Sequence, residues 1–202
     1  NSLNQLIKIT DPQNNITTYS YDKNGNRTSE TDANGKTTYY EYNYKGQLIK
    51  VTDSLGNVTT YTYGDTGCPS CGGGGDKLTS ITDAKGQTTM YLYDSLGRLI
   101  KITDPINGEI AYTYDSRGRL TSVTDPIGNT TTYEYDSLGR VIRTSSPDTG
   151  ITTYTYNSIG NLLTKTDANG VTTAYSYDVL NRLTLIQFPD QNENITYTYD
   201  NC

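Results

Sequence analysis

The sequence is short of the residue types from which most cores and active sites are built. Its 202 residues include no histidine, no tryptophan, one phenylalanine, one methionine and three cysteines. Without histidine the chain lacks the commonest general base and metal ligand near neutral pH, which disfavours most enzyme classes. Hydrophobic residues make up only 33% of the chain, and 20 of its residues are tyrosines, whose hydroxyls need a partner or water. We therefore expect neither an enzyme nor a thick, dry core.

Positive charge and long apolar runs are also scarce. The chain has 16 lysines and arginines against 22 aspartates and glutamates, for a formal net charge of −6. A phosphate backbone would be repelled, so nucleic acid is not an expected partner. No stretch approaches the roughly 18 consecutive apolar residues that a membrane helix needs, and the N-terminus has no basic-then-apolar leader pattern. The sequence thus predicts no membrane insertion by this segment.

What the sequence has instead is a tyrosine repeat. Tyr-x-Tyr pairs recur nine times, and most of them follow the previous pair by 21 residues. A fixed period of this length is typical of repeat architectures. We expect the repeat-defining tyrosines to be buried or stacked on one another within a sheet. They are Tyr19, Tyr21, Tyr40, Tyr42, Tyr61, Tyr63, Tyr91, Tyr93, Tyr112, Tyr114, Tyr133, Tyr135, Tyr154, Tyr156, Tyr175, Tyr177, Tyr197 and Tyr199.

Each repeat also carries two turn signals, in which an Asp or Asn is followed three residues later by Gly. Asp115/Gly118 and Asp125/Gly128 form one such pair of signals. Asp at the first position and Gly at the fourth suit a type I turn, and Pro126 stands at the second position, where a fixed φ is favourable. The pattern has some likeness to calcium loops, but the bidentate Glu of an EF-hand is missing. Turn chemistry is the favoured interpretation, and no metal site is predicted.

The segments between the turns are predicted to be short strands. RLIKIT (98–103), for example, is rich in β-branched residues and too short for an independent helix. Alternation along a strand puts Tyr133 and Tyr135 on one face. The same rule puts Leu120 and Val123 on opposite faces, which predicts that both faces of the sheet are partly apolar. The predicted fold class is all-β, with tandem antiparallel β-hairpin repeats forming a coiled sheet, a superhelix or part of a hollow β-shell.

One loop interrupts the single array of nine repeats that we predict over residues 1–202. About nine residues are inserted into a turn at 64–77, within the sequence GDTGCPSCGGGGD. Cys68 and Cys71 could be half of a zinc site, a redox pair or a local disulfide. Zinc would need two further ligands, and a glycine run supplies no helix start for a redox thiol. A disulfide-pinned or simply flexible loop is therefore favoured, with no cofactor, and Cys202 would be left to bond a neighbouring chain.

The units DSLGRLIKITDPINGEIAYTYD (94–115) and DSRGRLTSVTDPIGNTTTYEYD (115–136) resemble the Rhs/YD repeat, and the resemblance covers essentially the whole chain. This family includes bacterial Rhs polymorphic toxins, toxin-complex shells, wall-associated proteins and the animal teneurins. The resemblance implies a spiral of β-hairpins that forms a barrel or cocoon, usually secreted or delivered to a cell surface. The self-cleavage site and variable toxin of such shells have no counterpart in the sequence, and both ends look cut from a longer array.

Three functions follow as hypotheses. The first is structural and non-catalytic: a wall segment of a secreted Rhs-type shell that encloses or displays a toxin or effector domain. The second is an extracellular fibre or filament of continuous repeats, and the third is a carbohydrate-binding or adhesive module with exposed tyrosine faces. The expected partners are neighbouring repeats, copies of the chain itself, an enclosed effector domain or surface glycans. The expected location is extracellular or at a bacterial cell surface.

Overall fold

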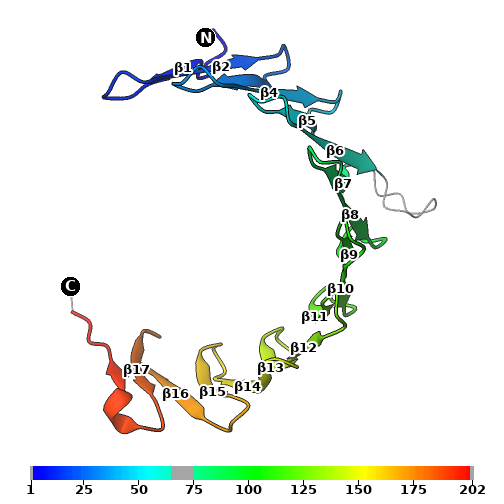
Figure 1. Ribbon diagram of the computed structural model, residues 1–202. Helices are drawn as coiled ribbons and strands as arrows, with labels where there is room; N and C mark the ends of the chain where they lie inside the picture. Colours follow the sequence, from blue (N-terminus) through cyan, green and yellow to red (C-terminus); the bar gives the residue numbers. More distant parts are fainter. Residues whose placement is uncertain (1, 65–74, 201–202) are drawn as a thin grey trace. The chain divides into compact units, whose positions relative to one another are not determined.

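The protein consists of short antiparallel strands joined by turns, in a computed structural model that describes residues 2–64 and 75–200 (Figure 1). Among these residues there is no α-helix, and no helix is long and apolar enough to cross a membrane. A single 3-10 turn, η1 (Gln191–Glu193), precedes the last strand. The chain divides into two compact units, Asn1–Glu109 and Ile110–Cys202. The all-β fold of antiparallel hairpin repeats that the sequence predicts is confirmed.

Within each unit the strands lie side by side in chain order, and each pairs antiparallel with the next. The strands of unit 1 are β1 (Lys8–Thr10), β2 (Ile16–Tyr21), β3 (Arg27–Thr31), β4 (Thr37–Tyr42), β5 (Leu48–Thr52), β6 (Val58–Gly64), β7 (Lys77–Thr82), β8 (Thr88–Tyr93) and β9 (Leu99–Thr103). At the unit boundary lies β10 (Glu109–Tyr114). Those of unit 2 are β11 (Leu120–Thr124), β12 (Thr130–Tyr135), β13 (Val141–Ser146), β14 (Gly150–Tyr156), β15 (Leu162–Thr166), β16 (Thr172–Tyr177), β17 (Leu183–Gln187) and β18 (Ile195–Thr196). Successive turns within a unit therefore alternate between the two ends of the strands.

The first residue of most turns, an aspartate or, at Asn43 and Asn157, an asparagine, organises the loop. In the turn at 125–129, the Gly128 N–H donates to the carbonyl of Asp125 (3.1 Å), and the Asp125 N–H donates to the carbonyl of Asn129 (2.9 Å). The Asp125 carboxylate accepts from the backbone N–H groups of Ile127 (3.0 Å) and Asn129 (2.8 Å). Gly128 has a φ of 89°, in the left-handed region. This is a type I turn followed by a left-handed residue, a common hairpin connection.

Asparagine takes the place of this glycine at four described positions. Asn4, Asn14, Asn107 and Asn181 have φ values of 57°, 64°, 67° and 63°. Asparagine tolerates the left-handed region better than other residues with a side chain, because its short polar group can bond the nearby backbone. Repeats that lack the Asp-x-x-Gly signature at these positions therefore keep the same backbone conformation there.

A β-bulge at the second tyrosine of a pair changes which side chains share a face. Tyr112 is paired with Val123, but Tyr114 is paired with Leu120, so β11 has one residue more than its partner between these pairs. Directly paired residues lie on the same face of a sheet. Leu120 and Val123 are therefore both on the face of the tyrosines, and the prediction that they lie on opposite faces is wrong. The extra residue of the bulge shifts the alternation by one.

The sheet of each unit is a single layer. No hydrophobic side chain among residues 2–64 and 75–200 is buried. In β12, Tyr133 and Tyr135 are half-buried, whereas Thr132 and Glu134 are exposed. We call the side with the tyrosine pairs and their aliphatic cross-strand partners the tyrosine face, and the other side the open face. Stability must therefore come from half-buried contacts along the sheet instead of from a second layer.

The left-handed turn position allows a direct test of the hairpin geometry. Gly35 has a φ of 76°, and a Cβ at this position would meet nothing within 4 Å, so only backbone strain opposes a side chain. Gly35→Ala is expected to lower the free energy of unfolding by about 1 kcal/mol. Gly35→Asn should cost clearly less, as at Asn14, Asn107 and Asn181. Urea unfolding followed by tyrosine fluorescence measures both, and equal losses would contradict the strain argument.

Candidate functional site: the tyrosine face and its clamps

The second tyrosine of a pair reaches across to the preceding strand. The Tyr135 hydroxyl donates to the carbonyl of Leu120 (2.7 Å), and the Tyr156 hydroxyl donates to that of Val141 (2.8 Å). Both carbonyls belong to residues at bulges, where the regular ladder is locally disrupted. Each bulge lies in the pairing with the strand on the other side. The Tyr135 hydroxyl thus ties β12 to β11 beyond the last paired residues of their ladder, Ser122 and Thr132. The same bond joins Tyr21 to Leu6, Tyr42 to Arg27 and Tyr199 to Leu183.

An arginine from the preceding turn covers the same tyrosine ring. Nε of Arg140 donates to the Asp136 carboxylate (2.6 Å), and Nη1 donates to the carbonyl of Asn157 in the next tyrosine-side turn (2.9 Å). Its guanidinium carbon lies 4.7 Å from the centre of the Tyr156 ring. We call this set of four residues an arginine clamp. It connects one repeat to the next through a charged hydrogen bond and a cation–π contact.

Clamps of this kind recur along the chain with small variations. Arg119 bonds Asp115 (2.6 Å) and the Asp136 carbonyl (3.0 Å), and it lies 4.6 Å from the Tyr135 ring centre. Arg182 lies 4.4 Å from the ring centre of Tyr199. In unit 1 Lys77 stands directly before Leu78, as Arg119 does before Leu120, and lies 5.7 Å from the Tyr93 ring centre. Arg27, one position later in its repeat, lies 4.8 Å from the ring centre of Tyr40. Either lysine or arginine can therefore supply the cation that covers the tyrosine ring.

The clamp arginines were not among the residues that the sequence analysis singled out. Their signal was nevertheless present, because Arg follows directly on the Asp-x-x-Gly or Asp-x-x-Asn of several turns, as in Arg98, Arg119, Arg140 and Arg182. An Asp and an Arg four positions apart would be an ordinary surface pair on a helix. Only the turn directs this arginine back onto its own Asp and forward onto the next repeat.

The carboxylates of these turns are stabilised in their charged form. The pKa of Asp136 lies below its ordinary value, because its carboxylate accepts the Arg140 backbone N–H and then the guanidinium. The pKa values of Asp94, Asp115 and Asp178 are lowered in the same way. In turns with asparagine at the fifth position, such as 53–57, the Asn57 side-chain amide is the largest cause of the lowered pKa of Asp53. The turn carboxylates thus form hydrogen bonds within their own turns, which stabilise both the turn and the charged form.

The predicted site residues fall into two groups. Of the 18 repeat-defining tyrosines, 16 are half-buried, whereas Tyr197 and Tyr199 are more exposed. The structure brings each pair onto one face, but the stacking of tyrosine rings on one another stays a prediction. Cys68, Cys71 and Cys202 lie outside the described residues. The predicted insertion at 64–77 lies largely outside the described residues as well, and its end residues Gly64 and Lys77 are paired with each other in the sheet.

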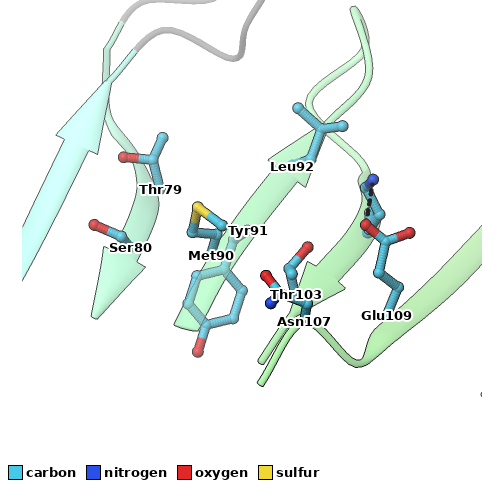
Figure 2. A pocket seen from close by; sticks show the side chains of 9 residues that line it. Thr79, Ser80, Met90, Tyr91, Leu92, Thr103, Asn107 and Glu109 are labelled. Carbon is cyan, nitrogen blue, oxygen red and sulfur yellow. Dashed lines mark hydrogen bonds and ion pairs between the residues drawn. The ribbon is translucent and has the colours of Figure 1, made fainter. Parts of the chain in front are cut away.

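The open face of unit 1 has a hollow over β7, β8 and β9, with a volume of about 600 Å³ (Figure 2). Met90 and Leu92, both exposed, lie among the hydroxyls of Ser80 and Thr103. An ion pair between Lys101 and Glu109 (2.8 Å) forms part of its lining. The remaining lining residues are Thr79, Tyr91 and Asn107.

The described residues show no constellation that would bind a metal. Within 2–64 and 75–200, no group of three or more Cys, Asp or Glu side chains is placed to hold an ion. The contacts of the tyrosine face and its clamps hold neighbouring repeats together.

Comparisons with known proteins agree with this architecture. The family model described as RHS Repeat matches residues 1–37, 42–67, 75–105, 93–126, 114–152 and 156–193. No match is found among curated proteins. The crystal structure of TcdB2-TccC3-Cdc42 is similar over 90% of this chain, with 18% identity and a TM-score of 0.68. That of TcdB2-TccC3 without its hypervariable C-terminal region has 19% identity and a TM-score of 0.67, again over 90% of this chain.

A third similar structure is the Tc holotoxin pore of Photorhabdus luminescens, with 20% identity and a TM-score of 0.51 over 90% of this chain. The matched region spans only 12% of the length of the two TcdB2-TccC3 chains and 9% of the holotoxin chain. At these identities the likeness shows a shared fold.

The tyrosine hydroxyl bond is testable with a matched pair of variants. Tyr135→Phe leaves the ring in place but removes the donor to the Leu120 carbonyl, and is expected to lower the free energy of unfolding by about 1 kcal/mol. Tyr133→Phe is the control, because the Tyr133 hydroxyl has no hydrogen-bond partner in the described part of the chain. Its effect should stay within about 0.5 kcal/mol. Urea unfolding of both variants decides, and indistinguishable midpoints would refute the role of the hydroxyl.

The turn carboxylates predict how stability responds to acid. Their pKa values are lower in the folded chain than the ordinary 3.8. The unfolded chain therefore takes up protons first as the pH falls. The free energy of unfolding should be level from neutral pH to about pH 5 and should decline below about pH 4. Asp136→Asn should reduce stability at neutral pH and flatten the acid decline, as measured by urea unfolding at each pH; an unchanged slope would contradict the assignment.

Proposed function

Because the chain belongs to the RHS repeat family, we propose that it is a structural wall segment of an Rhs-type shell, outside the cytoplasm, which encloses or displays a toxin or effector domain. The observation that carries this proposal is the arginine clamp, which at Arg119 and Arg140 joins one repeat to the next within a single-layered sheet. A wall must hold together through contacts in its own plane. The chain offers such contacts repeatedly.

The two faces of the sheet carry different kinds of side chain, as expected of a wall between two environments. The tyrosine face has rings and aliphatic side chains in half-buried positions, whereas the open face carries exposed threonines and ion pairs such as Lys50–Glu41 and Arg143–Glu134. Exposed pairs of this kind contribute little to stability. A single layer with two chemically different sides can face different environments on each side, as a wall does. The likeness to TcdB2-TccC3 over the fold supports the same proposal.

The extended fibre remains the second candidate, because the same clamps would hold an open array together equally well. Negative-stain electron microscopy of the full-length protein separates the two. Closed hollow particles support the shell, and long filaments support the fibre. The carbohydrate-binding alternative has less support, since the rings of Tyr135, Tyr156 and Tyr199 are already covered by guanidinium groups.

Limited proteolysis of the full-length protein tests the wall directly. An effector domain enclosed by the repeats should resist protease until the wall opens. Arg119→Ala, Arg140→Ala and Arg182→Ala together remove two clamps and the contact of Arg182 with the Tyr199 ring. They should shorten the protected lifetime of the effector by about fivefold or more. Arg143→Ala is the matched control, because this arginine pairs with Glu134 on the open face and belongs to no clamp. Equal protection in all variants, or a full-length protein without a further domain, would overturn the proposal.

A further inference from the structure

The turns of unit 2 form two rows, one along each end of its strands. The turns after tyrosine pairs, at 115–119, 136–140, 157–161 and 178–182, form what we call the tyrosine-side rim. The turns at 125–129, 146–150 and 167–171 form the threonine-side rim. Each repeat adds two strands, so turns on either rim follow one another at about 10 Å. The two rims therefore have the same period.

Aliphatic side chains project from the tips of these turns. On the tyrosine-side rim, Leu138, Ile159 and Leu180 in three consecutive turns are 64–70% exposed, and on the threonine-side rim Ile127 is 83% exposed. The turn itself does not require them, since Arg117 occupies the equivalent position in another repeat. Single exposed hydrophobic residues are ordinary on protein surfaces, but a periodic row of them is typical of a contact surface.

The two rims differ in charge. On the tyrosine-side rim the turn aspartates are paired with arginines, as in Asp136–Arg140, and Arg117 adds a further positive charge. On the threonine-side rim Asp125, Asp148 and Asp167 have no lysine or arginine within their own turns. The first rim is thus neutral to basic, and the second is acidic. Opposite charge at the same spacing makes the rims complementary.

We propose that the tyrosine-side rim of unit 2 packs against the threonine-side rim of a second copy of this chain, so that the tips of the hairpins interlock edge to edge. Such a contact uses different surfaces on the two copies, so it is a head-to-tail contact that can repeat. The apolar tips of the turns would supply attraction, and the charge difference would set which rim meets which. The contact is made by the turns at the ends of the strands. It does not depend on whether the wall encloses an effector.

Sedimentation velocity of the full-length protein, over a range of protein and salt concentrations, measures this association. Self-association should weaken as salt rises, because exposed charges are screened. The triple variant Leu138→Glu, Ile159→Glu and Leu180→Glu places acid opposite the acidic rim and should raise the dissociation constant by about tenfold or more. Leu163→Glu is the control, since Leu163 is exposed on a strand and not on a rim. Circular dichroism confirms that each variant is folded.

A charge exchange separates the rim contact from a general loss of solubility or folding. Arg117→Glu and Asp148→Lys each make the facing rims more alike in charge, so each variant alone should associate more weakly. Mixed together, the acidic tyrosine-side rim of one variant meets the more basic threonine-side rim of the other, and association should return. A wild-type protein that stays monomeric at all concentrations, a triple variant that sediments like wild type, or a mixture that fails to recover would overturn the proposal.

Discussion

In the part of the chain that the structure describes, hairpins pack only against their neighbours in the same sheet, and this constraint decides what holds them together. No hydrophobic side chain among residues 2–64 and 75–200 is buried, and an isolated hairpin is marginal in water. Stability therefore rests on contacts between consecutive hairpins. The guanidinium of Arg140 makes three such contacts. It donates to the Asp136 carboxylate in its own turn, donates to the Asn157 carbonyl in the next repeat and covers the ring of Tyr156. Stability then accumulates along the array from nearest-neighbour terms.

The β-bulge makes this arrangement possible. By admitting one extra residue opposite Tyr114, it brings both Leu120 and Val123 to the tyrosine face, which gathers the apolar side chains of each repeat on one side. It also leaves the carbonyl of Leu120 within reach of the Tyr135 hydroxyl. The other face carries mainly threonines and exposed ion pairs, together with the exposed side chains of Met90 and Leu92. The difference between the two faces therefore originates in the β-bulge, and the carbonyl of a bulge residue also accepts the tyrosine hydroxyl bond.

Much of the fold was predictable from particular residues. Asp125 and Gly128 mark a turn because a carboxylate accepts nearby N–H groups and glycine accepts a positive φ, and the segment 130–135 between turns forms the strand that its composition indicates. The left-handed Asn107 and Asn181 were less evident, since asparagine is common in this sequence and takes this conformation only where the turn demands it. The clamp arginines escaped because the carbonyl and the ring that they contact in the next repeat lie 16 or 17 residues away, across a strand.

The sequence by itself determined the period, the turns, the all-β class and the pairing of tyrosines on one face, because these depend on local conformational preferences and on alternation along a strand. Only the tertiary structure decided that Leu120 joins that face, that Arg119 and Arg140 bridge repeats, and that the turns form two rims of different charge. These features depend on the register between strands. A one-residue shift in register leaves the composition unchanged but moves a side chain to the opposite face.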